Sequence, residues 1–322
     1  MQTRKLGLSD LYLTTIGLGT WAMGGGDWKF GWGPQDDTNS LNAIHAALDQ
    51  GINWIDTAAI YGHGHAEEVV GKAIKGIRNE VIIATKCGRI WEGDSREIGK
   101  SLRANSIRRE VEASLKRLAI EVIDLYQIHW PEPDEEIEEG WGTIAELVKE
   151  GKIKYGGVSN FSLEQLKRAQ AIHPITSLQP PYSMLRREIE EEIMTYCGTN
   201  QIGIIAYSPM QAGLLTGKFT KERAAGLPES DWRSRHPFYM EPQLSINLRT
   251  IDQLRKIANE KKISLSQLSL AWVLRNKEVT SAIVGARSPQ QIEETAKAGD
   301  MSMTKTEVEA IEEVLTWRIN NL

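Results

Sequence analysis

The stretch Trp54-Ile55-Asp56-Thr57-Ala58-Ala59-Ile60-Tyr61-Gly62 contains the pattern that repeats along this chain. It begins with a short apolar run, typical of a buried strand, which breaks off at the carboxylate of Asp56. A segment of helical character follows at about 66–75. Burying a carboxylate at a strand end is costly unless a cation pairs with it. Lys86, which closes the next apolar run, is the candidate partner for both Asp56 and Tyr61.

Short apolar runs alternate with longer helical segments along the rest of the chain. Eight such runs predict strands, each followed by a helical segment: Thr15–Gly19, Asn53–Asp56, Val81–Lys86, Ile123–His129, Lys154–Ser159, Ser177–Gln179, Gly203–Tyr207 and Ser281–Val284. Strict strand-then-helix alternation predicts a parallel sheet, and eight units predict closure into a (β/α)8 TIM barrel of the α/β class. A doubly wound open sheet is the alternative. No composition shift or Pro/Ser-rich linker divides the chain, so we expect one domain over residues 1–322.

Some segments lie outside the eight units. Ahead of the first strand, Arg4–Leu6 and Leu11–Leu13 flank a turn and predict a hairpin that plugs the barrel floor. Between strands seven and eight, the stretch from Pro209 to about Ser245 is irregular, and loops of that length are usually functional lids or disordered. Two extra helices are expected after it, near Asn247–Lys262 and Ser264–Arg275.

The starts of several helices are marked chemically. Capping boxes are predicted at Ser162–Gln165, Ser264–Gln267 and Thr304–Glu307, the last of which begins a C-terminal helix. Pro289 suits the first position of another helix.

Bulk composition excludes several classes of protein. The 322 residues carry a formal net charge of −5, which gives no reason to expect a nucleic acid or an acidic membrane surface as partner. An apolar content of 41% with a charged content of 25% is ordinary for a soluble globular protein. No signal peptide or membrane-length apolar run is present, and the two cysteines lack metal-type spacing. We therefore expect a reduced, cytoplasmic protein with no membrane partner and no metal.

Polar side chains stand at or just past the end of every predicted strand. They are Thr20, Asp56, Lys86, His129, Ser159, Asn160, Gln179, Tyr207, Ser208 and Arg287. In a (β/α)8 barrel these strand ends converge on the one face that carries active sites. A set that combines an acid, a lysine, a histidine and two amides predicts a catalytic site there.

The charged members of this set predict proton transfer to a carbonyl. Lys86, held by Asp56, is expected to lower the pKa of Tyr61, so that the phenol exchanges its proton near neutral pH. His129 would donate a hydrogen bond to a carbonyl oxygen and orient it.

The reaction also requires a hydride, which no side chain supplies, so a nicotinamide cofactor is implied. Asn160 and Gln179 would hold its carboxamide, and Tyr207 offers a face for ring stacking. Paired carboxylates, a serine nucleophile elbow and a metal-ligand cluster are lacking in the sequence, which argues against a hydrolase.

Short motifs contain these polar residues and follow one another across nearly the whole chain. They are Gly17-Leu-Gly-Thr-Trp21, Asp56-Thr-Ala-Ala-Ile-Tyr-Gly62, Ala84-Thr-Lys86, Asp124-Leu-Tyr-Gln-Ile-His-Trp130, Gly157-Val-Ser-Asn-Phe161, Gln179-Pro-Pro-Tyr182, Tyr207-Ser-Pro209 and Gly213-Leu-Leu-Thr-Gly-Lys218. Together they resemble the aldo-keto reductase family. The bacterial general-stress aldo-keto reductases look like the nearer branch, and the potassium-channel β-subunits a more distant one.

The resemblance implies roles for individual residues. Tyr61 would be the proton donor, Asp56 and Lys86 would tune it, and His129 would position the substrate. Implied contacts to the cofactor come from Thr20, Trp21, Asp56, Ser159, Asn160, Gln179 and Tyr207 at the nicotinamide end, from Ser208, Pro209, Gly213, Leu214, Lys218 and Arg233 near the pyrophosphate, and from Gly285, Arg287, Gln291 and Glu294 near the adenosine.

The chain departs from the better-known family pattern at the adenosine end. Gly285 and Gln291 stand where a lysine and an arginine would grip the 2′-phosphate of NADPH. Arg287 and Ser288 would replace that grip, since the planar fork of arginine suits phosphate. NADPH is therefore the expected cofactor, with NADH less favoured.

The expected substrate is a small-molecule aldehyde or ketone. Trp21 and Trp130 are predicted to line its pocket, whereas lining and plain packing are equally compatible with Trp28, Trp32 and Trp91. The indoles favour flat or apolar carbonyls, but Arg89 and Arg96 would equally attract an anionic or sugar substrate.

The leading interpretation is NADPH-dependent reduction of aldehydes or ketones with Tyr61 as general acid. A cofactor-binding regulatory subunit with little turnover and an NAD-dependent alcohol or polyol dehydrogenase are the alternatives. Two other patterns carry little weight. Gly17-x-Gly19-x-x-Ala22 matches a dinucleotide fingerprint but is not followed by a helix, and His63-x-His65 lacks a further convergent metal ligand.

Overall fold

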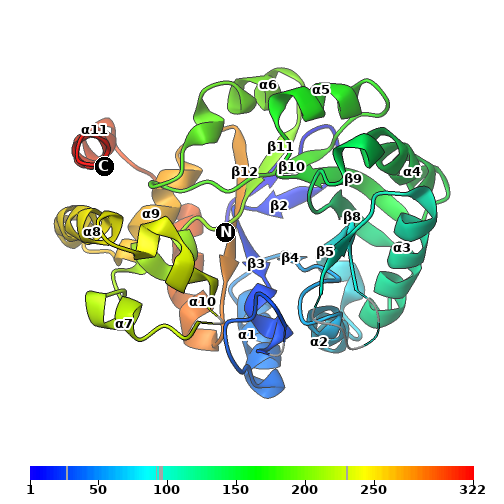
Figure 1. Ribbon diagram of the computed structural model, residues 1–322, viewed down its shortest axis with the longest axis horizontal. Helices are drawn as coiled ribbons and strands as arrows, with labels where there is room; N and C mark the ends of the chain where they lie inside the picture. Colours follow the sequence, from blue (N-terminus) through cyan, green and yellow to red (C-terminus); the bar gives the residue numbers. More distant parts are fainter. Residues whose placement is uncertain (27, 92, 94–96, 230) are drawn as a thin grey trace.

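The computed structural model describes residues 1–26, 28–91, 93, 97–229 and 231–322. Eight parallel strands close into a barrel (Figure 1). In spatial order they are β10 (Ser177–Gln179), β11 (Gly203–Ala206), β12 (Val279–Gly285), β3 (Ile16–Gly19), β4 (Trp54–Asp56), β5 (Ile82–Cys87), β8 (Ile123–Ile128) and β9 (Ile153–Ser159). The predicted TIM barrel is confirmed, with strand bounds within about two residues of those expected. Closure of the sheet excludes the doubly wound alternative.

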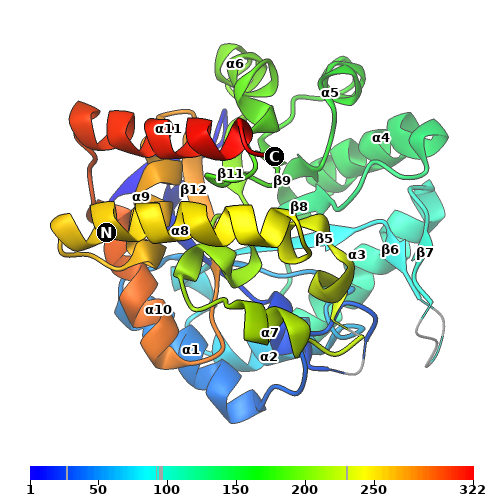
Figure 2. The ribbon, with the colours of Figure 1, turned by 60° about the vertical axis from the view of Figure 1, so that its left-hand side comes forward.

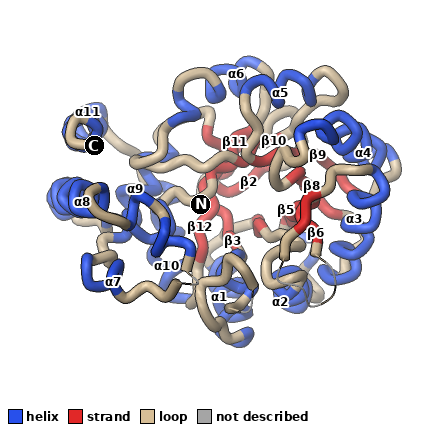
Figure 3. The backbone as a smooth tube through the Cα atoms, viewed as in Figure 1, coloured by secondary structure: helices blue, strands red, loops and turns tan. Residues whose placement is uncertain are grey.

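A helix follows each barrel strand and packs outside it (Figure 3). The helices of this ring are α1 (Asp37–Asp49), α2 (His65–Ala73), α3 (Ala104–Leu118), α4 (Ile137–Lys149), α5 (Leu163–Gln170), α6 (Ile193–Thr199), α9 (Leu265–Leu274) and α10 (Pro289–Ala296). The capping boxes expected at Ser162, Ser264 and Thr304 are all present, and Pro289 begins α10. Local capping chemistry therefore sets these helix starts.

Successive strand residues face the helices and the barrel interior in turn. In β5, Ile83 belongs to the core beneath the helices, whereas Ala84 packs inside the barrel with Trp54. The same alternation directs Thr85 towards α2 and Lys86 into the interior. A single strand thus supplies one residue to the helix layer and the next to the site.

The floor of the barrel is formed by the predicted hairpin. Its strands are β1 (Thr3–Lys5) and β2 (Tyr12–Thr14), one residue away from the expected bounds. Leu6, Leu11 and Leu13 cluster with the interior residues of the barrel strands. Apolar side chains therefore fill the amino end of the barrel.

The segment between β11 and β12 contains most of the departures from a simple barrel. The stretch predicted to be irregular contains 3₁₀ turns η5 (Gln211–Thr216), η6 (Trp232–Arg235) and η7 (Pro237–Tyr239) and the short helix α7 (Lys221–Ala225). The next helix, α8 (Gln243–Glu260), begins before the predicted Asn247. It lies beside the C-terminal helix α11 (Lys305–Ile319), outside the ring (Figure 2).

A second hairpin was not predicted from the sequence. Its strands are β6 (Arg89–Ile90) and β7 (Gly99–Lys100), which follow β5 at the carboxyl face. Strands this short carry no hydrophobic alternation, so the sequence pattern could not predict them. No helix in the described parts of the chain is both long and apolar enough to cross a membrane.

Packing inside the barrel makes Gly17 a stringent test of the fold. A Cβ atom there would lie 2.0 Å from Cε2 of Trp54, so Gly17→Ala requires the indole or the strand to move. We expect this variant to lose about 3 kcal/mol of unfolding free energy. Gly142→Ala, in α4, is the control, because nothing lies within 4 Å of its added methyl group. Urea denaturation should show that the unfolding free energy of Gly142→Ala rises by about 0.5 kcal/mol. Equal denaturation midpoints for Gly17→Ala and wild type would contradict the close packing of Gly17 on Trp54.

Candidate active site

Three side chains predicted to meet do lie together at the carboxyl end of β4 and β5. The Nζ atom of Lys86 donates to Oδ2 of Asp56 (2.7 Å), to the carbonyl oxygen of Thr57 (2.8 Å) and to Oη of Tyr61 (3.2 Å). Asp56 and Lys86 are 3% and 1% exposed. The ammonium is therefore fully hydrogen-bonded inside the barrel, with its third donor aimed at the tyrosine.

Burial has the largest effect on the pKa values of Lys86 and Tyr61. It lowers the pKa of Lys86, and the pairing with Asp56 opposes that effect. It raises the pKa of Tyr61 well above its ordinary value, and the charge of Asp56 adds to the rise. The sequence prediction of a lowered pKa for Tyr61 is thus wrong for this structure, because burial and the charge of Asp56 both disfavour the phenolate. Tyr61 keeps its proton at neutral pH, as a proton donor must.

His129 lies across from Tyr61, with ring centroids 5.8 Å apart in an edge-on arrangement. It follows β8, and its backbone N–H donates to the carbonyl oxygen of Cys87 (3.0 Å). Burial lowers the pKa of the imidazole well below its ordinary value, and the nearby cations Lys86 and Arg89 lower it further. The ring is therefore neutral at physiological pH and can donate one hydrogen bond without carrying charge.

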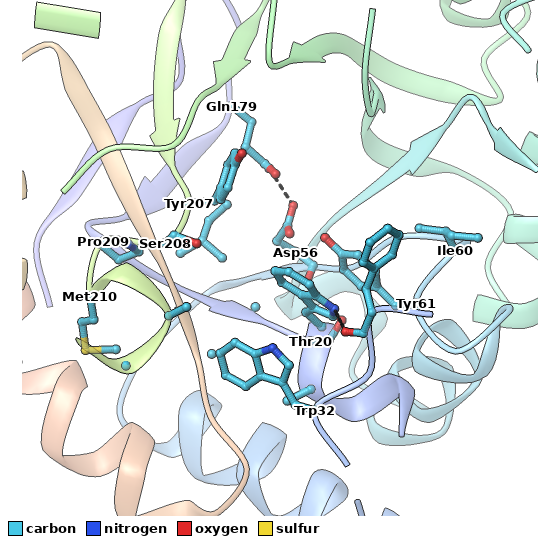
Figure 4. A pocket seen from close by; sticks show the side chains of 18 of the residues that line it. Thr20, Trp32, Asp56, Ile60, Tyr61, Gln179, Tyr207, Ser208, Pro209 and Met210 are labelled. Atoms are coloured by element: carbon cyan, nitrogen blue, oxygen red, sulfur yellow. Dashed lines mark hydrogen bonds between the residues drawn. The ribbon is translucent and has the colours of Figure 1, made fainter. Parts of the chain in front are cut away.

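Amides and hydroxyls form a connected network on the other side of Asp56. Gln179 Nε2 donates to Asp56 Oδ1 (2.8 Å) (Figure 4). Ser159 Oγ donates to the carbonyl oxygen of Gln179 (2.8 Å). Asn160 Nδ2 donates to Ser159 Oγ (3.0 Å), and Tyr207 Oη donates to Asn160 Oδ1 (2.8 Å). Burial raises the pKa of Tyr207 to about 12, so this hydroxyl remains a donor. The network holds the polar side chains of four strand ends in fixed orientations.

A cavity of about 800 Å³ opens above these residues at the carboxyl face. That volume is in the range of cofactor and substrate sites. Of the predicted site residues, those that line it are Thr20, Trp21, Asp56, Tyr61, His129, Trp130, Ser159, Asn160, Gln179, Tyr207, Ser208, Pro209, Gly213, Lys218, Arg233, Gly285, Arg287, Gln291 and Glu294. Two do not: Lys86 lies beneath the lining, and Leu214 packs its side chain into the hydrophobic core.

Indoles form one wall of this cavity beside Tyr61. The ring centroid of Trp21 lies 6.4 Å from Trp28, 5.7 Å from Trp32 and 6.3 Å from Tyr61. Trp28 and Trp32 are therefore lining residues, which the sequence left open. Trp91 instead stacks on His63, with ring centroids 5.4 Å apart.

The cavity rim carries charge next to this aromatic wall. The guanidinium of Arg89 lies 5.5 Å from the ring centroid of Trp130 and forms an ion pair with Glu132 (2.7 Å). Lys100 contacts the same carboxylate (2.9 Å). Arg96, which the sequence grouped with Arg89, lies outside the described residues.

The two arginines expected to contact the cofactor differ in whether a carboxylate compensates their charge. Arg233 forms an ion pair with Asp231 (2.6 Å), and its guanidinium lies 4.9 Å from the ring centroid of Trp32. Its charge is thus already compensated. Arg287 donates to Gln35 Oε1 (2.8 Å) and to backbone carbonyl oxygens of the loop before α1, and within the described chain it has no carboxylate partner. Its charge is held by neutral acceptors.

Other lining residues were missed by reasoning from strand ends. They are Met210, Ala212, Thr216, Arg223, Ser266 and Thr295, among others. They come from η5, α7, α9 and α10, whose helical patterns give no sign of which residue faces a cavity. Thr216 belongs to the motif quoted at 213–218, although no contact was assigned to it there.

Comparison with known sequences decides the family. The sequence model of the Aldo/keto reductase family matches residues 15–316. The chain belongs to the aldo/keto reductase family. Its sequence is 39% identical to aldo-keto reductase YhdN of Bacillus subtilis (100% of this chain, 91% of the relative) and 34% identical to the NADH-specific methylglyoxal reductase of Escherichia coli (98% of both).

A solved structure gives the same result. The glycerol dehydrogenase AKR11B4 of Gluconobacter oxydans superimposes with a TM-score of 0.91 and 38% identity, over 99% of this chain and 97% of that protein. This aldo/keto reductase is therefore an NAD(P)H-dependent oxidoreductase.

The side chains present fit a nicotinamide dinucleotide in this aldo/keto reductase. Amides and hydroxyls gather at the Asp56 end of the cavity, and Tyr207 presents a ring there. Asn160 and Ser208, at φ of 64° and 51°, turn the backbone sharply beside it. Cations including Lys218 and Arg287 border the other end, as an anionic pyrophosphate and adenosine group require.

A partly buried carboxylate, Glu110 of α3, supports the strand that carries Lys86. Its Oε2 accepts from the backbone N–H of Gly88 (2.8 Å), and its Oε1 accepts from Ser106 Oγ (3.0 Å). Burial raises its pKa to about 7, although both hydrogen bonds oppose the rise. In the folded protein Glu110 therefore stays protonated up to about pH 7, whereas in the unfolded chain it loses its proton near its ordinary pKa of 4.5.

Glu110→Gln should change how the stability of this aldo/keto reductase depends on pH. The folded-state pKa of about 7 exceeds the ordinary value of 4.5, so the stabilisation is present below about pH 4.5 and lost as the pH rises through 7. Between about pH 5 and pH 8, wild type should lose roughly 2–3 kcal/mol relative to Glu110→Gln. Urea denaturation of both proteins at both pH values measures this difference. A constant difference would show that Glu110 is charged throughout.

Proposed function

We propose that this protein reduces aldehydes or ketones to alcohols with NADPH as hydride donor and Tyr61 as general acid. The observation that carries the proposal is the contact between Tyr61 Oη and Lys86 Nζ (3.2 Å), with Asp56 completing the group. The neutral imidazole of His129 across the cavity supports it.

Each side chain has a defined part in this reaction. When bound, the reduced nicotinamide supplies a hydride for the carbonyl carbon. Tyr61 donates its proton to the carbonyl oxygen, and the Lys86 ammonium stabilises the phenolate that remains. Asp56 keeps Lys86 charged in its buried position, and His129 donates a hydrogen bond that orients the carbonyl. Hydride on carbon and proton on oxygen give the alcohol, and solvent reprotonates the tyrosine.

Removing the phenol should separate chemistry from binding. Tyr61→Phe is expected to lower kcat at least about 100-fold, the usual contribution of a positioned acid, while the NADPH Kd stays within about twofold. The assay is NADPH oxidation with aromatic, aliphatic, dicarbonyl and sugar aldehydes. Tyr155→Phe is the matched control, because its hydroxyl bonds to Asp10 at the barrel floor (2.8 Å). Retained turnover in Tyr61→Phe would show that Tyr61 is not the acid. If wild type binds NADPH tightly but turns over no substrate, a regulatory subunit is favoured instead.

The preference for NADPH rests on Arg287. Its guanidinium bonds only to neutral acceptors in the described chain, so a 2′-phosphate would supply the missing negative charge. Glu294 also lines the cavity and would instead suit the ribose hydroxyls of NADH. One relative is named as NADH-specific, which makes the measurement necessary.

Arg287→Ala should weaken NADPH binding about tenfold or more, because a charge-assisted hydrogen bond to phosphate is lost, and should leave the NADH Kd nearly unchanged. Arg249→Ala, an exposed arginine of α8, is the control for general loss of positive charge. Cofactor fluorescence titration measures the NADPH and NADH Kd of wild type and of both variants. Tighter binding of NADH than NADPH by wild type would overturn the cofactor proposal.

Oxidation of a polyol is a second candidate function, since one similar structure is a glycerol dehydrogenase. The same side chains would serve this direction, with the alcohol proton passing to Tyr61 in its phenolate form, which the raised pKa of Tyr61 makes rare at neutral pH. Glycerol with NADP⁺ or NAD⁺ therefore belongs beside the carbonyl panel. Faster alcohol oxidation than carbonyl reduction at neutral pH would favour this second function.

A further inference from the structure

A second fully buried carboxylate lies behind the Asp56–Lys86 pair and has no part in the chemistry described so far. Glu67 belongs to α2 and is 0% exposed. Carboxylates are almost never buried completely unless they are paired, so its position calls for an explanation.

Glu67 joins three elements of the barrel wall. Its Oε1 accepts from Thr85 Oγ1 of β5 (2.6 Å), and its Oε2 accepts from Arg117 Nε of α3 (2.7 Å). Both oxygens are satisfied by short hydrogen bonds, one of them charge-assisted. The carboxylate therefore holds α2 and α3 against the strand that carries Lys86.

Residues next to Lys86 and residues bonded to Tyr61 both take part in these contacts of α2 with β5. Thr85 precedes Lys86, so fixing its side chain fixes the backbone from which Lys86 extends into the barrel. At the other end, the N–H of Ala66, next to Glu67, donates to the carbonyl oxygen of Tyr61 (3.2 Å). Lys86 lies on β5 and Tyr61 lies in the turn just before α2, and Glu67 ties α2 to β5.

The pair also reaches the aromatic wall. The guanidinium of Arg117 lies 5.7 Å from the ring centroid of Trp91, which packs against the cluster that contains Tyr61 and Trp28. The negative charge of Glu67 additionally favours the charged form of Lys86 and so raises its pKa. The hydrogen bonds of Glu67 and its negative charge therefore both support a charged Lys86 at its place beside Tyr61.

We propose that Glu67 is a positioning residue that, through its hydrogen bond with Thr85, sets the contact between Tyr61 Oη and Lys86 Nζ. This inference rests on the proposed roles of Tyr61 and Lys86 in carbonyl reduction. Glu67 hydrogen-bonds to neither Tyr61 nor Lys86, and it acts through the link between α2 and β5.

A buried carboxylate on the neighbouring strand β8, Asp124, provides a control for a purely structural role. Asp124 accepts from the N–H of Ile83 in β5 (2.8 Å) and from Arg78 Nη2 (2.7 Å). It also bonds to β5 and to an arginine, but near the amino end of the strand. Asp124→Asn should therefore destabilise the fold without changing the Tyr61–Lys86 contact.

Thr85→Val is the decisive variant, because it keeps the side-chain shape and removes only the hydroxyl donor to Glu67. We expect kcat to fall about tenfold, the cost of a misplacement well below 1 Å, while KM and the NADPH Kd stay within about twofold. Thr85→Ser, which restores the hydroxyl, should recover kcat to within about threefold of wild type. Kinetics are measured at a temperature at which circular dichroism shows every variant to be folded. Glu67→Gln is less clean, because its amide would place an N–H against Arg117.

The possible results are distinct. A fall in kcat for Thr85→Val with recovery in Thr85→Ser and near-wild-type kcat in Asp124→Asn supports the inference. Wild-type kcat in Thr85→Val, or an equal fall in Asp124→Asn, overturns it. Tyr61→Phe is assayed alongside: if Tyr61→Phe loses turnover while Thr85→Val keeps it, only the positioning role fails, whereas turnover retained in Tyr61→Phe means that the proposed function itself fails.

Discussion

The charges of Asp56 and Lys86 lie 2.7 Å apart inside the barrel, almost without contact to solvent. Neither charge could remain there alone, because each would have to be neutralised or exposed to water. The pair therefore requires that β4 and β5 be adjacent, with both strand ends at the same depth. That requirement is met by the parallel barrel, which brings the end of every strand to one face. Tyr61 then receives a cation at its hydroxyl without any further charge entering the interior.

Much of the fold could be predicted because its signals are local and repeated. Apolar strands, helical periodicity and capping residues such as Ser162 and Thr304 all act within a few residues of one another. The strand-end residues were predictable for the same reason, since in a barrel the end of a strand defines its place in space. The hairpin of β6 and β7 escaped prediction, because two-residue strands leave no periodic trace and depend on tertiary contacts.

The properties that the sequence could not supply depend on burial and on distant partners. The direction of the pKa shift of Tyr61 follows from its desolvation, and no motif reports how completely a side chain is covered. Arg233 and Arg287 read alike in sequence as phosphate ligands. The structure separates them, because one meets Asp231 close by and the other meets carbonyl oxygens of a loop some 250 positions away. The role of Glu67 could not be read from the sequence, because only the packing of α2 and α3 on β5 reveals what it joins.

The leucines of the β1–β2 hairpin have a kinetic consequence. They fill the amino end of the barrel, so the cavity at the carboxyl face does not continue along the barrel axis. Any molecule that binds in the cavity therefore enters and leaves on the carboxyl side. The rate of exchange is then set by the loops of that face and not by a path through the barrel.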